Sequence, residues 1–102
     1  MSKRLAYLEK ITSEGSKDPF AWYGLALEYK TLGRVDDALR AFETLKKNNP
    51  DYVPMYLMCG QMLAEAHRGG AKSWLDAGIV AARVKGDSHA LGELEAALDA
   101  LD

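Results

Sequence analysis

Cysteine and histidine are the two residue types best suited at neutral pH to supply a nucleophile, a general base or a transition-metal ligand. Cys59, His67 and His89 are the complete set. A metal site or a nucleophile–base pair is recognised by short, regular spacing of such residues, or by carboxylates beside them. His67 and His89 stand 22 positions apart, and neither has such a spacing to Cys59. The sequence therefore predicts no catalytic residues, no metal site and no cofactor, so we do not expect an enzyme.

Two other segments carry a partial chemical signature. Met55, Met58 and Met62 recur at helical spacing beside Cys59, a pattern that suits a core-filling helix face, an adaptable partner surface or a soft-metal site. Residues 69–73 contain two glycines and a Lys-Ser pair, but a phosphate-binding loop needs glycine directly before Lys-Ser and a preceding strand. We interpret the methionines as core residues and the glycine-rich segment as a chance match.

Composition and charge narrow the class of protein. Hydrophobic residues make up 48% and charged residues 27% of the 102 positions, which is typical of one folded globular domain. No apolar run approaches the roughly 18 residues of a membrane-spanning helix. From Gly86 onward there are five acidic residues and no basic ones, which argues against a nucleic-acid surface there. The single cysteine excludes an internal disulfide, and we expect a cytoplasmic protein.

Glycine and proline divide the chain into helical segments. Between them, apolar residues recur every three or four positions, the period of an α-helix rather than of a strand. We predict six helices: one that ends near Gly15, then residues 19–32, a third that ends before Pro50, and residues 54–66, 71–84 and 88–101. Asp18 before Pro19 favours the second start, and Asp36 or Asp37 is expected to cap the third helix.

The expected helices have defined apolar faces. The first helix carries Leu5, Leu8 and Ile11, and the second carries Trp22, Leu25, Ala26 and Tyr29. The inner face of the third is predicted to consist of Ala38, Leu39, Phe42 and Leu45, and that of the last helix of Leu91, Leu94, Leu98 and Leu101. Each set follows one side of a helix, so each helix must bury that side against a neighbour.

One segment of 34 residues, from Pro19 to Tyr52, has a distinctive order of large and small side chains. Its first helix carries Trp22, Leu25, Ala26 and Tyr29, Gly33 lies at the turn, and its second helix and end carry Ala38, Phe42, Leu45 and Pro50. The two alanines allow close helix approach, and the aromatic side chains can fill the space around that contact. This segment resembles the tetratricopeptide repeat along its whole length.

The rest of the chain resembles further parts of the same repeat. Residues 53–86 are predicted to form a divergent second repeat, with Tyr56, Cys59, Gly60 and Leu63 in its first helix. Its turn is lengthened by residues 67–70, and Ala77, Ala81 and Val84 are the expected inner face of its second helix. Residues 1–16 resemble the second helix of an incomplete preceding repeat. Residues 87–102 resemble a capping helix, with Glu95 where a full repeat has a small residue.

The resemblance implies a fold and a function. The fold is all-α, a right-handed superhelical stack of antiparallel helix pairs within a single domain, residues 1–102. The function is protein–protein interaction, as an adaptor or scaffold that binds a peptide or helix of a partner in a concave groove lined by the first helices of the repeats. The groove positions carried over from the family are Phe20, Tyr23, Leu27, Lys30, Thr31, Pro54, Leu57, Gln61, Ala64 and Glu65.

Other binding modes stay open at this point. Some family members bind the terminal carboxylate of chaperones with lysine and asparagine at the positions of Tyr23 and Leu27, so the resemblance implies no such charge-dependent capture here. A partner could also use the convex face or an end of the stack. Alternatively, two copies could bury their apolar surfaces against each other, which would make the chain a self-associating structural module.

Overall fold

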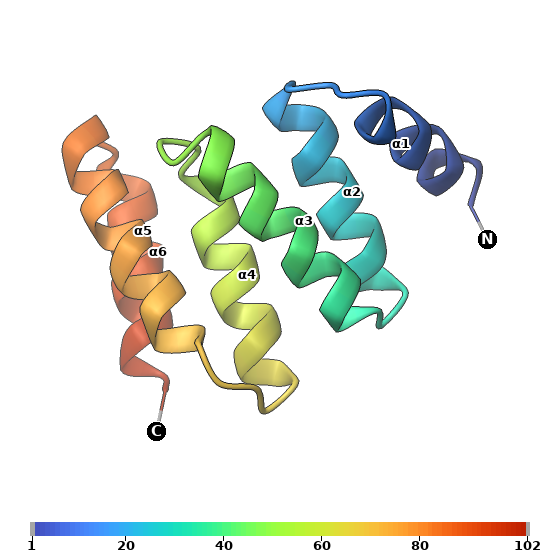
Figure 1. Cartoon of the computed structure of the whole chain (residues 1–102). Helices are drawn as coiled ribbons and strands as arrows, with labels where there is room; N and C mark the ends of the chain where they lie inside the picture. Colours follow the sequence, from blue (N-terminus) through green and yellow to red (C-terminus); the bar gives the residue numbers. More distant parts are fainter. Residues whose placement is uncertain (1, 102) are drawn as a thin grey trace. The chain divides into compact units, whose positions relative to one another are not determined.

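The computed structural model describes residues 2–101 as an arrangement of helices (Figure 1). In chain order they are α1 (Lys3–Ser13), α2 (Pro19–Thr31), α3 (Val35–Asn48), α4 (Pro54–Glu65), α5 (Ala71–Lys85) and α6 (Ser88–Asp99). These six helices, with no strand among residues 2–101, confirm the all-α prediction. Met1 and Asp102, the ends of the predicted first and last segments, lie outside the described residues.

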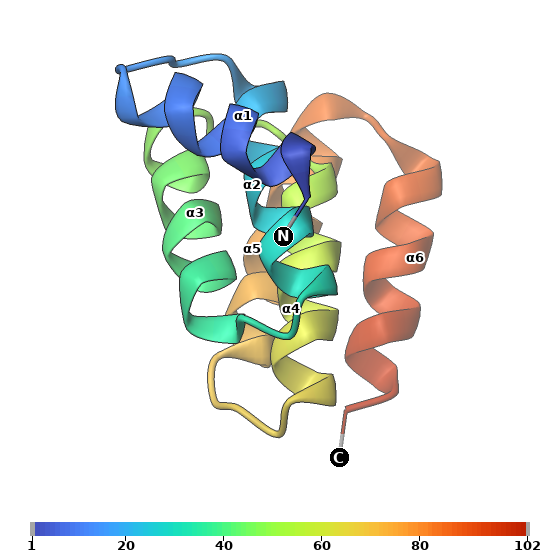
Figure 2. The ribbon, with the colours of Figure 1, turned by 90° about the vertical axis from the view of Figure 1, so that its right-hand side faces the viewer.

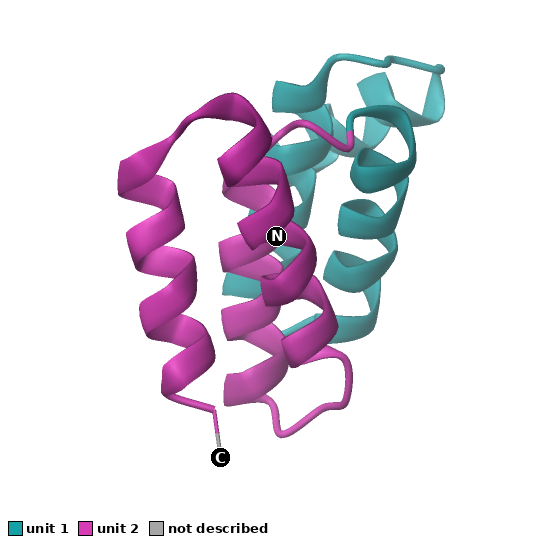
Figure 3. Cartoon of the chain, turned by 90° about the vertical axis from the view of Figure 1, so that its left-hand side faces the viewer, with its two compact units in different colours: residues 1–49 teal, residues 50–102 magenta. Residues whose placement is uncertain are grey.

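The helices divide into two compact units (Figure 3). Unit 1 spans Met1–Asn49 and contains α1, α2 and α3, whereas unit 2 spans Pro50–Asp102 and contains α4, α5 and α6. In each unit two consecutive helices form a hairpin, α2 with α3 and α4 with α5, and a third helix packs on that hairpin. The predicted boundaries of the repeats and of the single domain stay predictions.

Local signals explain where α2 begins and where α1 and α2 end. The Asp18 side chain accepts a hydrogen bond from the Phe20 amide at 3.0 Å, and Pro19 occupies the first turn, as predicted. Gly15 and Gly33 follow α1 and α2 with φ angles of +92° and +74°. This left-handed conformation is readily reached only by glycine, so these residues reverse the chain at low cost.

The core of unit 1 is the contact between α2 and α3. Ala26 and Ala38 are both fully buried, as are Phe42 and Leu45. Small side chains at the two alanine positions let the helices approach, and the larger side chains fill the surrounding space. On the other side of α2, a Cβ on Gly24 would lie 3.4 Å from Leu8 Cδ1 of α1, so α1 packs closely on α2.

Three details of unit 1 differ from the sequence prediction. Neither Asp36 nor Asp37 caps α3, because the helix already begins at Val35 and its N-cap residue, Arg34, makes no side-chain cap bond. Both carboxylates instead lie in the first turn, where they face the positive end of the helix dipole. In α1 Thr12 is buried with Leu5 and Leu8, whereas Ile11 is half-buried, and the Thr12 hydroxyl is satisfied by donating to the Leu8 carbonyl at 2.7 Å. In α3, Ala41 is buried and Leu39 only half-buried.

The turn from α4 to α5 contains two residues in the left-handed region. His67 has a φ of +54° and Gly70 a φ of +98°. The chain therefore reverses over residues 66–70, and the Arg68 amide donates to the Leu63 carbonyl at 2.8 Å to close the end of α4. Gly86, with a φ of +71°, ends α5 in the same way.

The inner face of α5 corrects the prediction for the second repeat. The buried residues of α5 are Ala71, Trp74, Leu75, Gly78, Ile79 and Ala82. Ala77 and Ala81 are only half-buried, and Val84 is 83% exposed. Leu75 occupies the position in α5 that Ala38 occupies in α3. It follows Ala38 by 37 positions, so the turn is three residues longer than in a 34-residue repeat. The prediction assumed a longer insertion and therefore placed the wrong side of the helix inward.

With the correct register, unit 2 packs by a different exchange of large and small residues. Gly60 of α4 faces Leu75 of α5, and a Cβ on Gly60 would lie 2.6 Å from Leu75 Cδ2. Gly78 is enclosed on two sides, since its Cβ would lie 2.5 Å from Tyr56 Cβ and 2.8 Å from Leu94 Cδ2. Leu94 belongs to α6, which lies alongside α5 and α4 (Figure 2). The last helix therefore completes the core of this unit.

Candidate protein-binding faces

The N-terminal helix of the first hairpin, α2, has a buried side and an accessible side. Ala21, Gly24, Leu25 and Ala26 are buried in unit 1. The five predicted binding residues of this helix lie outside that set. Phe20 is 72% exposed and Thr31 is exposed, whereas Tyr23, Leu27 and Lys30 are half-buried. The helix therefore presents an aromatic and aliphatic surface that the core does not use.

Packing inside unit 1 holds part of this surface in place. The ring of Tyr23 meets the ring of Phe42 edge-on, with centroids 6.5 Å apart and an interplanar angle of 61°. Because Phe42 is fully buried, the Tyr23 ring packs on one side against the core. Phe20 lies in the first turn, where its amide is fixed by the Asp18 cap. Both rings therefore have little backbone freedom to lose on binding.

The N-terminal helix of the second hairpin, α4, has an equivalent division. Its buried residues are Met55, Tyr56, Cys59, Gly60, Met62 and Leu63. The predicted binding residues again lie outside the buried set: Pro54, Gln61 and Glu65 are exposed, and Leu57 and Ala64 are half-buried. This face is less apolar than that of α2, because it has no aromatic side chain. The residues predicted from the sequence are thus accessible on both helices, and their role in binding stays a prediction.

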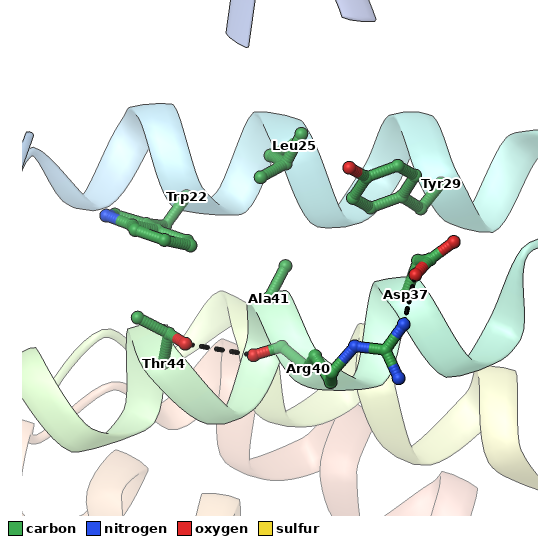
Figure 4. A pocket seen from close by; sticks show the side chains of 7 residues that line it. All are labelled: Trp22, Leu25, Tyr29, Asp37, Arg40, Ala41 and Thr44. Carbon is green, nitrogen blue, oxygen red and sulfur yellow. Dashed lines mark hydrogen bonds and ion pairs between the residues drawn. The ribbon is translucent and has the colours of Figure 1, made fainter. Parts of the chain in front are cut away.

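A pocket that sequence reasoning missed lies between α2 and α3 (Figure 4). Its volume is about 190 Å³, and its lining consists of Trp22, Leu25, Tyr29, Asp37, Arg40, Ala41 and Thr44. From the sequence, Trp22 and Tyr29 are expected to fill the space around the helix contact. They instead flank an opening, because Ala41 and Thr44 of α3 are too short to fill the space between them. The signal in the sequence was this pair of small residues three positions apart.

Hydrogen bonds and charges fix the walls of the pocket. The Trp22 indole Nε1 donates to the Ser16 carbonyl at 2.7 Å, and the Tyr29 hydroxyl donates to Glu9 Oε2 at 2.6 Å. The Arg34 guanidinium lies 4.6 Å from the centre of the Tyr29 ring, in a cation–π contact. Burial, followed by the hydrogen bond to Glu9, raises the pKa of Tyr29 to about 12. Hydrogen bonds from Arg34 and then Arg40 lower the pKa of Asp37 below its usual value.

The raised pKa of Tyr29 predicts a pH dependence of stability. The folded state favours the neutral phenol, so the stabilisation is complete below the unfolded pKa of 10.0 and is lost as the pH rises through the folded pKa of about 12. Urea unfolding across this interval should show a falling free energy of unfolding. Tyr29→Phe should flatten that fall, and Tyr7→Phe, at a 63% exposed tyrosine of α1, should leave it as in the wild type. Equal slopes for wild type and Tyr29→Phe would contradict the assignment.

Comparison with known proteins decides the family. The sequence pattern of the tetratricopeptide repeat matches residues 19–52. The crystal structure of a tetratricopeptide repeat domain protein from Salinibacter ruber is 34% identical, with a TM-score of 0.71, over 79% of this chain and 91% of that one. This chain belongs to the tetratricopeptide repeat family.

Two further solved structures are similar to this repeat protein. The solution structure of a tetratricopeptide repeat domain protein from Salinibacter ruber is 35% identical over 79% of this chain and 83% of that one, with a TM-score of 0.73. A protein from Bordetella parapertussis shares the fold at 23% identity, with a TM-score of 0.80 over 97% of this chain and 87% of that one. No curated protein matches the sequence.

Membership of this family carries a general function. Tetratricopeptide repeats are protein–protein interaction modules, and the fold generally serves binding rather than catalysis. The cysteine and the two histidines differ in burial. Cys59 is fully buried in the core of unit 2, whereas His67 and His89 are exposed. His89 Nε2 lies 3.3 Å from Glu93 on the next turn of α6.

The methionines beside Cys59 are also largely core residues. Met55 is fully buried and Met62 is 3% exposed, while Met58 is half-buried. Within residues 2–101, no group of three or more histidine, cysteine, aspartate or glutamate side chains is arranged to hold a metal ion. No helix in the same residues is long and apolar enough to span a lipid bilayer.

Proposed function

We propose that this chain is an adaptor that binds a peptide or helix of a partner protein with the accessible faces of α2 and α4. The observation that carries the proposal is Phe20, which exposes 72% of its surface on a helix whose core side is already satisfied. An aromatic side chain exposed to this extent can bury apolar area against a partner, which is favourable. The family resemblance supports the proposal, because it assigns this position to the binding surface.

The two faces suit a mostly apolar ligand. On α2, Phe20 and Tyr23 offer aromatic area with few rotatable bonds, and Leu27 adds aliphatic contact. Lys30 on α2 and Gln61 on α4 can then orient the ligand by hydrogen bonds to its backbone. Because Tyr23 and Leu27 replace the charged and amide residues of the carboxylate-binding members, we expect affinity with little dependence on salt.

The proposal includes a location and excludes catalysis. A cytoplasmic location is supported by the single, fully buried thiol of Cys59, which suits a reducing compartment. We assign no reaction to the chain, because a thiol that is fully buried in a core is shielded from substrates and reagents in solution.

The proposal is tested by selecting peptide ligands from a displayed library and measuring their affinities by calorimetry. Phe20→Glu combined with Leu57→Glu should weaken the selected ligands by about a hundredfold, roughly one factor of ten for each lost apolar contact. Phe20 is the better target than Tyr23, because the Tyr23 ring also packs on the core.

Tyr7→Glu is the matched control. Tyr7 is 63% exposed on α1, a helix that carries none of the residues proposed to bind, so its replacement should leave the affinity unchanged. Circular dichroism must show that all variants remain helical. Equal loss of affinity in the control, or ligands that ignore the double variant, would move the binding surface away from α2 and α4.

A further inference from the structure

The helix α5 has a second apolar face in addition to its core face. Ala77, Val80, Ala81 and Val84 follow each other at steps of three, one and three residues, the spacing of one helix side. Val80 is 60% exposed and Val84 is 83% exposed. The repeat resemblance predicts three of these four residues, Ala77, Ala81 and Val84, in the core. The two alanines are instead half-buried and the two valines exposed, and we call the four residues the outer stripe of α5.

The helices of unit 2 cannot cover this stripe. Tyr56 of α4 and Leu94 of α6 both meet α5 at Gly78, where an added Cβ would lie 2.5 Å and 2.8 Å from them. Both neighbouring helices are therefore fixed on the core side of α5. The two valines of the outer stripe stay in water while the core of the unit is complete, which is unfavourable in an isolated molecule.

Charged residues beside the stripe have a self-complementary order. Asp76 and Arg83 are seven residues apart, two helical turns, so they lie on the same flank of the stripe. Asp76 pairs with Lys72 at 2.7 Å and Arg83 with Glu95 at 3.8 Å, but all four side chains are at least 46% exposed. Exposed ion pairs of this kind contribute little, so either residue can exchange its partner at low cost.

An antiparallel second copy of α5 matches both features. When two such helices meet about a two-fold axis near Val80, each flank faces the same flank of the other copy, with the chain direction reversed. Asp76 of one copy then lies opposite Arg83 of the second, and the same pair repeats on the other side of the axis. Ala77 faces Val84 of the second copy, and the short alanine side chains let the helices approach.

We propose that the outer stripe of α5 is a self-association surface, which joins two copies of this chain as an antiparallel helix pair centred near Val80. The surface uses none of the residues proposed to bind on α2 and α4, so the proposed adaptor function does not depend on it. A few exposed apolar side chains form a small contact area, and we therefore expect a weak, concentration-dependent dimer.

Cysteine cross-linking tests the geometry. In the proposed dimer Val80 of one chain lies near Val80 of the second chain, so Val80→Cys should form a disulfide-linked dimer under mild oxidation. The two copies of Val84 are offset by about 12 Å along the helix axis, beyond the reach of a disulfide, so Val84→Cys alone should form no disulfide-linked dimer. The native thiol of Cys59 is fully buried and does not compete. Cross-linking through Val84→Cys but not Val80→Cys would overturn the antiparallel arrangement.

Sedimentation equilibrium tests the charge pairing and the surface. Arg83→Asp should raise the dissociation constant by about tenfold or more, because it sets two like charges opposite each other in both of the paired contacts. Combining it with Asp76→Arg should restore the wild-type value. Val84→Asp should weaken the dimer, and Phe20→Asp, at another highly exposed apolar residue, 72% exposed on α2, should not.

The remaining outcomes oppose the proposal. A wild-type chain that stays monomeric at millimolar concentration would overturn it. A dimer that is lost with Phe20→Asp but kept with Val84→Asp would also overturn it, and would place self-association on the α2 face. All substituted side chains are exposed, so circular dichroism should show unchanged helix content in every variant.

Discussion

Gly60→Ala is expected to lower the free energy of unfolding by about 1–3 kcal/mol, although alanine is the better helix former. The new Cβ would lie 2.6 Å from Leu75 Cδ2 and 2.7 Å from Leu75 Cγ. Leu75 is 1% exposed, so it has no free space into which to move, and α4 and α5 must separate instead. Urea denaturation of the variant and of the wild type measures the difference.

A second substitution should reverse the sign of this effect. Leu75→Ala alone leaves a cavity and should cost about 2–5 kcal/mol. In that background the methyl group added by Gly60→Ala enters the vacated space, so Gly60→Ala should be neutral or stabilising. The double variant would then carry alanine at the positions that Ala26 and Ala38 occupy in unit 1. The double-mutant cycle measures the coupling directly.

The control for this cycle is Gly92→Ala. Gly92 lies in α6 with no atom within 4 Å of an added Cβ, so only helix propensity changes and stability should rise by about 1 kcal/mol. If Gly60→Ala costs the same with and without Leu75, the proposed exchange of small and large residues between α4 and α5 is wrong.

Phe42→Ala should lower the free energy of unfolding by about 3–5 kcal/mol, a large share of the stability of a small domain. The side chain is fully buried between α2 and α3, and the ring of Tyr23 rests on it at 6.5 Å. Its removal therefore leaves a cavity in the core and loosens the aromatic surface proposed to bind a partner. Thermal and urea unfolding give the stability change.

Phe20→Ala is the matched control for Phe42→Ala. The same chemical change at a side chain that is 72% exposed should alter stability by less than about 0.5 kcal/mol. Ligand affinity also distinguishes the two variants, since Phe20→Ala should reduce the affinity without loss of stability. Similar destabilisation by both substitutions would show that the Phe20 side chain stabilises the fold and is not reserved for ligand binding.

Several features of this protein follow from the sequence alone because their causes are local. Asp18 and Pro19 start α2 through hydrogen bonding and a fixed φ angle that involve only adjacent residues. Gly15, Gly33 and Gly86 end helices because they readily take left-handed φ angles. The spacing of large and small residues in 19–52 depends on a constant repeat length, and so the family could be identified without coordinates.

The accessibility of the residues proposed to bind was predictable for a similar reason. A position on a regular helix determines which side the residue lies on, and so all five predicted residues of α2 and all five of α4 lie outside the buried sets. The cap of α3 was harder to predict. Two adjacent aspartates both suit a helix start, and the ion pairs of Asp37 with Arg34 and Arg40 that hold it in the first turn require the folded helix.

The tertiary structure alone decided the inner face of α5 and the pocket beside Trp22. The helix has apolar residues on two sides, so periodicity cannot tell which side is buried, and the three-residue extension of the preceding turn rotates it relative to the repeat. Only the contacts of Gly60 with Leu75, and of Gly78 with Tyr56 and Leu94, select one side. The pocket likewise depends on the distance between two helices, which packing sets and local sequence does not.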